Sequence, residues 1–217
     1  MGLCVAGQEV SDPISIWRDY ARTYPRTISD YDLGPAGEPD TLTLGEILRM
    51  RVIDSDISDG EAEELAERAA ERRCPWEDVP ADADLARADP DIARGLFDKA
   101  ARFYWHFTSD RISRPRIAKV HKALHLKRPG MYPILDDRLR KLYGDRATLW
   151  VGRLTRLHVT IDDSAPFWAA IRQDLVGNEA ELGVYRCQLG ADSDERLRQM
   201  ARLSDLRLLD IVAWTAC

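Results

Sequence analysis

The chain has 217 residues, of which 45% are hydrophobic and 31% are charged, and its formal net charge is −6 at pH 7. These values describe a globular protein with one substantial core, or two small domains that share one, and they argue against a general binder of polyanions. No apolar run approaches the roughly 18 to 20 residues that span a bilayer, so we expect no association with a membrane.

The N-terminal stretch and the cysteines bear on the compartment. The stretch MGLCVAGQEVSDP has too short an apolar part and no basic start for a signal peptide, and we expect it to be disordered. The four cysteines are scattered without a CxxC spacing. This pattern predicts neither a disulfide framework nor a zinc site, and it favours reduced thiols and a cytoplasmic location. We expect no metal and no cofactor.

Capping residues predict three helices in the first part of the chain. A first helix is expected at 14–24, with Asp12 as its N-cap. Thr43 caps a second helix, and Glu46 three residues later completes a capping box. Asp59 opens a third helix, whose acidic start and basic end suit the helix dipole.

A Pro-rich stretch at 74–90 is the best candidate for an internal boundary. Beyond it, apolar residues at helical spacing predict a long helix at 91–108. Further helices are expected at about 115–126, 136–143, 148–160, 166–174, 179–188, 194–203 and 204–214. Apart from LHVTI at 157–161, nothing alternates with the period of a strand. We therefore predict an all-α protein, in which an N-terminal helical segment, 1–90, packs on a core formed by 91–217, with tryptophans as core anchors.

Positive charge is concentrated in one segment of this acidic chain. Residues 111–146 hold eleven Lys or Arg against three Asp, so this segment carries +8 and the remainder carries −14. Such asymmetry is typical of a docking face for phosphates or for an acidic partner. The alternative is internal pairing, in which the acidic segment 54–91 neutralises the basic face.

Two helices and a Pro-rich turn occupy the centre of the basic segment. Ser113 is expected to cap the first helix, and Pro129 to end it. Asp136 then caps the second helix, which is expected to end at Gly144 in a left-handed C-cap. A helix start beside a basic turn favours phosphate binding, and a purely structural N-cap is the alternative for Asp136. The residues expected to contact nucleic acid are Arg111, Ser113, Arg114, Arg116, Lys119, Lys122, Lys127, Arg128 and Arg138.

Two further groupings are weighed on the same helices. His121 and His125 are spaced i, i+4 and share a helix face, but no acid or cysteine lies nearby in the sequence. We therefore expect packing or phosphate contact from them rather than metal binding. On the last helix, Asp210 is expected either to pair with Arg207 or to anchor the fold from within.

The run KALHLKRPGMYPILDDRLRKLYG, residues 122–144, resembles the second half of the helix-hairpin-helix DNA glycosylase signature, with Pro133, Asp136 and Leu139 at the matching places. A looser resemblance, which extends over most of the chain, is to a family of small actinobacterial proteins of unknown function. It rests on the KRP…P…D run and on a last helix that carries Asp210 and Trp214. The glycosylase resemblance implies a helix-hairpin-helix bundle with flanking N- and C-terminal helices.

The same resemblance implies a chemistry for the site. Asp136 would activate water or an amine and stabilise the charge that develops on the sugar as a flipped-out base leaves. Lys119 or Lys122 would be the nucleophile of a bifunctional enzyme. The chain departs from the signature because its hairpin has no Gly-x-Gly turn, and because Pro133 and Asp136 are one residue further apart than in the signature. These departures leave open whether it is an enzyme.

Two functions therefore follow from the sequence. The first is a helix-hairpin-helix protein that binds duplex DNA mainly through its phosphates and is related to base-excision glycosylases. The second is a catalytically inactive interaction module whose basic face binds an acidic protein.

Overall fold

A computed structural model describes residues 2–109, 117–157 and 163–216 of the chain. Its elements are, in chain order, β1 Leu3–Val5, β2 Gln8–Val10, α1 Pro13–Thr23, η1 Thr27–Asp32, α2 Leu44–Leu48, η2 Arg49–Ile53, α3 Asp59–Ala70, η3 Trp76–Asp78, η4 Leu85–Arg87, α4 Leu96–Thr108, α5 Ile117–His125, α6 Asp137–Arg156, α7 Ala165–Gly177, α8 Glu179–Gly190, α9 Glu195–Met200 and α10 Asp205–Ala216. The elements η1 to η4 are short π- or 3₁₀-helices. The described residues are therefore predominantly helical, as predicted, with one small pair of strands.

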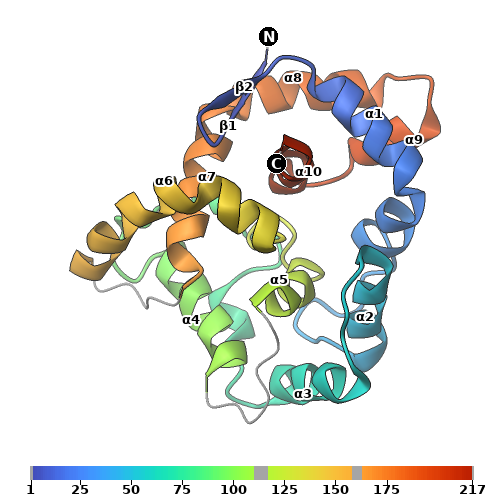
Figure 1. Cartoon of the computed structure of the whole chain (residues 1–217). Coiled ribbons are helices and arrows are strands. Elements are labelled where there is room, and N and C mark those ends of the chain that lie inside the picture. Colours follow the sequence, from blue (N-terminus) through green and yellow to red (C-terminus); the bar gives the residue numbers. More distant parts are fainter. Residues whose placement is uncertain (1, 110–116, 158–162, 217) are drawn as a thin grey trace.

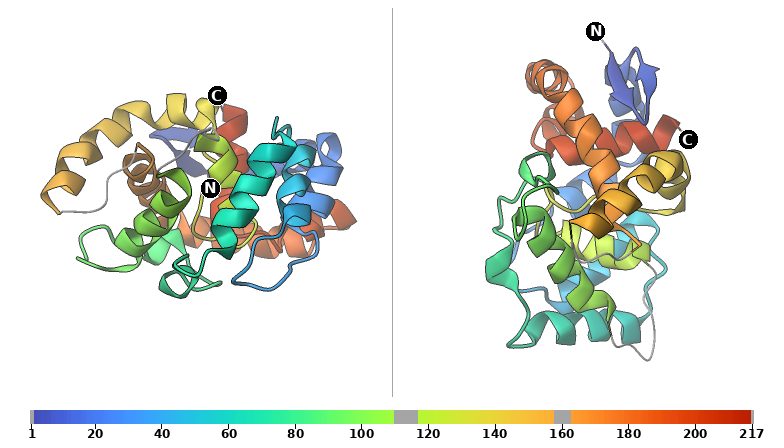
Figure 2. Two further views of the ribbon diagram at one scale, coloured as in Figure 1. Left: turned by 90° about the horizontal axis from the view of Figure 1, so that it is seen from below. Right: turned by 90° about the vertical axis from the view of Figure 1, so that its left-hand side faces the viewer.

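The last helix, α10, is the centre around which one half of the molecule is arranged (Figure 1). It contacts α1, α6, α7, α8 and strand β1, and α6 and α7 pack against each other. The pairs α2–α3 and α3–α4 build the other half, and α5 contacts both α4 and η2. Figure 2 shows that β1, β2 and the end of α10 lie at the same end of the molecule.

One cluster of buried apolar side chains extends through the described residues. It crosses the Pro-rich stretch that the sequence suggests as a boundary. There Trp76 packs edge-on against Phe103 of α4, with 4.8 Å between ring centroids. Trp17 and Trp168 are fully buried, as expected of core anchors, whereas Trp105 is half exposed. The N-terminal segment and the predicted core thus share their apolar interior.

The N-terminus forms an antiparallel hairpin of β1 and β2, so the expectation of a disordered start is wrong. Ala6 and Gly7 make its two-residue turn with φ angles of 50° and 83°, which suit the twist of a tight hairpin. Asn178 holds the hairpin from α7–α8: its Oδ1 accepts from the Cys4 N–H at 2.8 Å, and its Nδ2 donates to the Cys4 carbonyl at 2.7 Å. Asp174 accepts the Ala6 N–H at 2.6 Å. A three-residue strand carries too little pattern to be read from sequence.

The predicted starts of α1 and α2 are confirmed, and in both the capping side chain bonds a backbone N–H three residues further along the chain. Asp12 accepts a hydrogen bond at the start of α1. Thr43 and Glu46 form the expected capping box of α2. At α3, Ser58 is the cap and forms a capping box with the glutamate three residues later, while Asp59 is the first helical residue. Such local hydrogen bonds depend on spacing alone, which is why the sequence reveals them.

Helix α4 begins at Leu96, five residues later than predicted. Arg94 adopts a left-handed φ of 57°, which interrupts the helix before Gly95. The Asp91 carboxylate forms an ion pair with Arg153 at the far end of α6 instead of capping α4. The turn before α4 therefore places Asp91 in contact with a residue 62 positions away, and the local sequence pattern cannot predict such a contact.

The helices predicted at 136–143 and 148–160 form a single helix, α6. Gly144 lies in its middle and does not adopt the left-handed conformation that a C-cap requires. The reason is a continuous buried stripe at helical spacing, which includes Tyr143 and Ala147 on either side of Gly144. Residues 158–161, most of the LHVTI run, lie outside the described residues.

We expect Gly144→Ala to raise the free energy of unfolding by about 0.5–1 kcal/mol, because glycine in a helix interior is less favourable than alanine. A Cβ built at this position meets no atom within 4 Å, so nothing offsets the gain. Urea denaturation monitored by circular dichroism measures the change. A loss of stability would mean that Gly144 is a left-handed cap after all.

Within the described ranges, no helix is long and apolar enough to cross a membrane. Cys4, Cys74 and Cys187 carry free thiols, and Cys217 lies outside these ranges.

Candidate functional site

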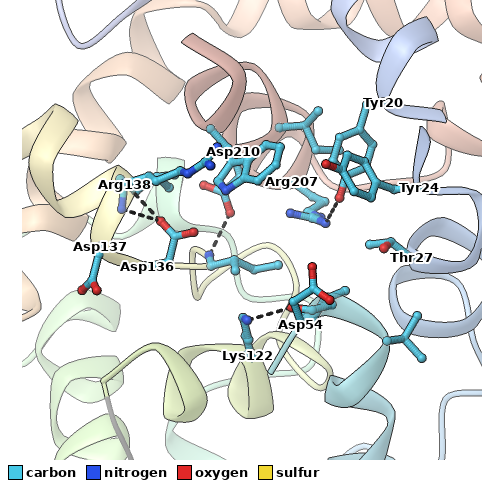
Figure 3. A pocket seen from close by; sticks show the side chains of 16 residues that line it. Tyr20, Tyr24, Thr27, Asp54, Lys122, Asp136, Asp137, Arg138, Arg207 and Asp210 are labelled. Atoms are coloured by element: carbon cyan, nitrogen blue, oxygen red, sulfur yellow. Dashed lines mark hydrogen bonds between the residues drawn. The ribbon is translucent and has the colours of Figure 1, made fainter. Parts of the chain in front are cut away.

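A pocket of about 370 Å³ opens where α1, η2, α5, α10 and the start of α6 meet. Its chemistry comes from carboxylates, cations and aromatic rings that converge from these separate elements (Figure 3). The side chains that matter most are Lys122 of α5, Asp136 and Arg138 at the start of α6, and Arg207, Asp210 and Trp214 of α10.

Asp136 is the N-cap of α6, as predicted. Its Oδ1 accepts the backbone N–H groups of Arg138 and Leu139, both at 3.0 Å. The turn before it is tied to α10, because the Ile134 N–H donates to Asp210 Oδ2 at 2.8 Å. These contacts fix the half-buried Asp136 carboxylate in the pocket wall.

The two candidate lysines, Lys119 and Lys122, lie on the same helix, α5, but their side chains have different partners. Lys122 lines the pocket with Asp136, and its Nζ donates to the Ile53 carbonyl at 2.9 Å. Burial lowers the pKa of Lys122, while the carboxylates of Asp136 and Asp54 oppose that shift. Lys119 does not line this pocket, and its Nζ is held by both oxygens of Glu61, at 2.7 and 2.8 Å. Of the two, only Lys122 lines the same pocket as Asp136.

Aromatic rings form the wall of the pocket beside α10. The Arg138 guanidinium lies over the Trp214 ring, 4.6 Å from its centroid. Tyr24 meets Trp214 edge-on at 5.8 Å between centroids, and Tyr20 lies 5.0 Å from Tyr24. Trp214 thus contacts Arg138 and Tyr24 within this aromatic wall.

A buried charge network underlies this wall. Arg207 donates from Nε to Asp32 Oδ1 at 2.9 Å and from Nη2 to the Tyr20 hydroxyl at 2.9 Å. The expected pairing of Arg207 with Asp210 therefore gives way to a pairing with Asp32. Asp210 instead anchors the turn through Ile134, which is the other role expected for it.

Asp210 is 2% exposed, and burial raises its pKa to about 7, opposed by the Ile134 N–H and by Arg207. The negative charge of Asp136 adds to the increase. Asp136 and Asp210, two of the four aspartates that line the pocket, thus have different environments.

Residues 15–217 match the model of a family of unknown function, DUF6308. The chain belongs to this family. No curated protein and no solved structure matches the chain. Every residue that lines the pocket falls inside the part matched to DUF6308. No activity is known for the family, so the side chains of this DUF6308 protein are the guide to its chemistry.

Much of the basic surface expected from the sequence lies inside the DUF6308 fold. Arg128 is 0% exposed; its Nε donates to the Val79 carbonyl at 2.6 Å and its Nη2 to Asp40 at 2.8 Å. Lys127 is buried and forms an ion pair with Glu46. Both side chains are therefore placed to hold the fold together rather than to meet phosphates.

Lys119, Lys127 and Arg128 form ion pairs with acidic side chains, but only one of these acids lies in the segment 54–91 where the partners were expected. Glu61, which holds Lys119, belongs to the acidic segment 54–91, whereas Glu46 and Asp40 precede it. Arg138 is exposed at the start of α6, as a phosphate contact requires. The remaining predicted contacts, Arg111, Ser113, Arg114 and Arg116, lie outside the described residues.

His121 and His125 are packing residues in the DUF6308 protein. His121 Nδ1 bonds the Ile117 carbonyl at 2.9 Å, and its Nε2 accepts from Trp168 Nε1 at 2.9 Å. His125 Nδ1 bonds the Tyr132 carbonyl at 2.7 Å. Burial lowers the pKa of each imidazole to about 3, so both rings are neutral near pH 7. In the ranges that the structure describes, no three His, Cys, Asp or Glu side chains are grouped to hold a metal ion.

Sequence reasoning identified Asp136 and Lys122 but missed most of the pocket wall. Tyr20 lies on α1 and Tyr24 is its C-cap, both more than 100 residues from Asp136, and nothing in their local pattern indicates a site. Asp210 was expected to have a structural role or to belong to the resemblance of the last helix, and Trp214 was noted only through that resemblance or as a core anchor. Their common spacing of four residues, which places both on one face of a helix, is the one local signal that could have linked them.

Proposed function

We propose that this protein binds DNA and receives an extruded nucleotide in the pocket between α5, α6 and α10. The observation that carries the proposal is the shared pocket of Asp136 and Lys122, because a carboxylate at a helix start beside a lysine is the pair that the helix-hairpin-helix glycosylase resemblance implies. The aromatic wall of Tyr24 and Trp214 supports it, since an unstacked base regains stacking energy on such rings.

The chemistry of the proposal is hydrolysis of an N-glycosidic bond. Water attacks the sugar carbon, the base leaves with the electrons of the broken bond, and the proton of the water passes to the Asp136 carboxylate. Before that transfer, the negative charge of Asp136 stabilises the positive charge that develops on the sugar. Lys122 is an amine whose pKa burial lowers, which favours the neutral form that could attack the same carbon.

DNA would be held by fewer cations than the sequence predicts. Lys119, Lys127 and Arg128 are engaged inside the fold, so the proposed contacts are the exposed start of α6, where Arg138 lies, and the predicted contacts at 111–116. The dependence of affinity on salt is then shallower than the full set of eight predicted cations would produce. The alternative of an acidic protein partner relied on the same basic face, and these internal pairs give it no support.

Fluorescence anisotropy on a duplex that carries a tetrahydrofuran abasic analogue, beside an undamaged duplex, tests the proposal. We expect tighter binding to the abasic duplex and weaker binding to both at higher salt. Asp136→Asn should keep this binding, because asparagine also caps helices well, and should abolish release of any base that the wild type excises. Asp145→Asn, an exposed change of the same charge on α6, is the control. If neither duplex binds at low salt, the proposal is wrong.

A further inference from the structure

Helix α10 carries two nearly buried charged side chains of opposite sign that line the pocket. Arg207 is 6% exposed and Asp210 is 2% exposed. They are three residues apart and therefore neighbours on the helix surface, but each is bound elsewhere. Arg207 forms its ion pair with Asp32, and Asp210 accepts the N–H of Ile134. Figure 3 shows both side chains on the pocket side of α10.

Each of these two side chains has one polar atom that none of the described residues bonds. Nε and Nη2 of Arg207 donate to Asp32 and to the Tyr20 hydroxyl, and within the described ranges nothing accepts from Nη1. Asp210 Oδ2 accepts the Ile134 N–H at 2.8 Å, and no donor in the same ranges reaches Oδ1. Because a nearly buried polar atom costs free energy when it lacks a partner, these two atoms are candidate contacts for a ligand.

A second group of the same kind lines the pocket with each of these atoms. The Tyr20 hydroxyl accepts from Arg207 Nη2 at 2.9 Å, so among the described residues its own O–H is left to donate. Asp136 uses Oδ1 for both backbone N–H groups of the α6 cap, so its Oδ2 is an acceptor on the pocket wall. The pocket thus presents a pair of donors and a pair of acceptors.

The charges of these groups determine which ligand satisfies both pairs. The Arg207 guanidinium, whose other edge is paired with Asp32, is always protonated and only donates, so it takes a carboxylate oxygen rather than an ammonium group. The charges of Asp136 and Asp210 act on each other, so an ammonium group beside them relieves their repulsion. A ligand with one charge leaves one pair without a partner. A neutral ligand can bond both pairs, but charge-assisted hydrogen bonds are about twice as strong as neutral ones.

Aromatic and aliphatic side chains form much of the remaining wall of the pocket. Tyr24 and Trp214 meet edge-on at 5.8 Å between ring centroids, and Ile53 and Ile211 also line the cavity. The volume of about 370 Å³ lies within the range of small-molecule sites. An apolar group of the ligand would therefore pack against this wall.

We propose that the pocket binds a free α-amino acid with an aromatic or branched apolar side chain. Its carboxylate accepts from Arg207 Nη1 and from the Tyr20 hydroxyl. Its ammonium group donates to Asp210 Oδ1 and to Asp136 Oδ2, and its side chain lies against Trp214. The inference goes beyond the proposed function, because a free amino acid binds here without nucleic acid and competes with an extruded nucleotide for the same space.

Isothermal titration calorimetry on the full chain, without DNA, tests the inference. The ligands are L-phenylalanine and L-leucine, which carry both charges, phenethylamine, which carries the cation alone, and 3-phenylpropionate, which carries the anion alone. The titrations are run at pH 8, where Asp210 is ionised, because burial raises its pKa to about 7. We expect one of the two amino acids to bind at least about tenfold more tightly than either ligand with a single charge.

Two variants separate the donor pair from the acceptor pair and leave the ion pair of Arg207 with Asp32 in place. Tyr20→Phe should weaken binding of the amino acid and of phenylpropionate by about three- to tenfold and leave phenethylamine unchanged. Asp210→Asn keeps a carbonyl for the backbone N–H that Asp210 accepts, and it should weaken binding of the amino acid and of phenethylamine by about tenfold. Arg202→Gln, an exposed change that does not line the pocket, should follow the wild type.

The outcomes separate this inference from the proposed function. The inference is overturned if neither amino acid binds the wild type, or if a ligand with a single charge binds as tightly. An amino acid that binds Tyr20→Phe or Asp210→Asn as tightly as the wild type overturns it too. None of these results alters the binding of DNA duplexes. If the amino acid binds with the expected pattern and neither duplex binds, the inference holds and the proposed function is wrong.

Discussion

Arg128→Met is expected to lower the free energy of unfolding by about 4 kcal/mol. The guanidinium donates to the carbonyls of Val79 and Pro39, at 2.6 and 2.7 Å, and its removal leaves these acceptors without a donor. The Val79 carbonyl is buried, and leaving such an acceptor unsatisfied costs about 1–3 kcal/mol, while the charge-assisted bond to the exposed Pro39 contributes less. The substitution also removes the cation that lies 5.2 Å from the centroid of Trp76.

Lys141→Met is the matched control, because Lys141 is an exposed cation of the same segment. Its substitution should change stability by no more than about 0.5 kcal/mol. Urea denaturation at pH 7.5 compares the two variants with the wild type. If Arg128→Met proves as stable as Lys141→Met, the guanidinium is not held inside the fold, and Arg128 returns as a candidate phosphate contact.

Lowering the pH from 6.5 to 5 should destabilise the protein by about 1 kcal/mol per pH unit on average, as the net effect of three buried groups. His121 and His125 have native pKa values of about 3 against about 6.5 when unfolded, so their stabilisation is lost as the pH falls below 6.5. Asp210 acts in the opposite sense. Its native pKa is about 7, against 3.8 for an ordinary aspartate, so the native state gains stability from its proton as the pH falls.

Asp210→Asn removes the opposing contribution, so the loss of stability should steepen to about 2 kcal/mol per pH unit on average over the same range. This window lies above the range in which Glu46 and Glu61, whose ion pairs and hydrogen bonds lower their pKa values, become protonated. Urea denaturation at pH 5.0, 5.5, 6.0 and 6.5 provides the slopes. Parallel slopes in the wild type and in Asp210→Asn would show that Asp210 is ionised in the native state throughout this range.

Features that depend on a few neighbouring residues were predictable from the sequence. The caps at Asp12, Thr43 and Asp136 each satisfy backbone groups two or three residues away, so their spacing alone identifies them. The amphipathic pattern likewise identified the helical class. Gly144 shows the limit of such signals, because a glycine between two periodic stretches suits either a cap or a helix interior, and packing on either side decides.

The fate of the basic segment could not be predicted, because its partners are distant in sequence. Lys127 and Glu46 are 81 residues apart, and Arg128 and Asp40 are 88 apart. Counting charges reveals an excess of cations, but it does not show which of them form ion pairs or hydrogen bonds inside the fold. The same holds for the pocket, where Asp136 has a local signature and Tyr20 and Tyr24 have none.

The attachment of the N-terminal hairpin has a consequence for the biosynthesis of this chain. Cys4 and Asn178 are separated by 174 residues, so at roughly 5–20 residues per second the ribosome needs roughly 10–35 s to supply the partner of the hairpin. An isolated two-stranded hairpin is only marginally stable in water. Leu3 and Val5, fully covered in the finished protein, therefore stay exposed on the nascent chain for most of translation. We expect the outer edges of β1 and β2 to be open to association with other nascent chains until α7 and α8 have been synthesised.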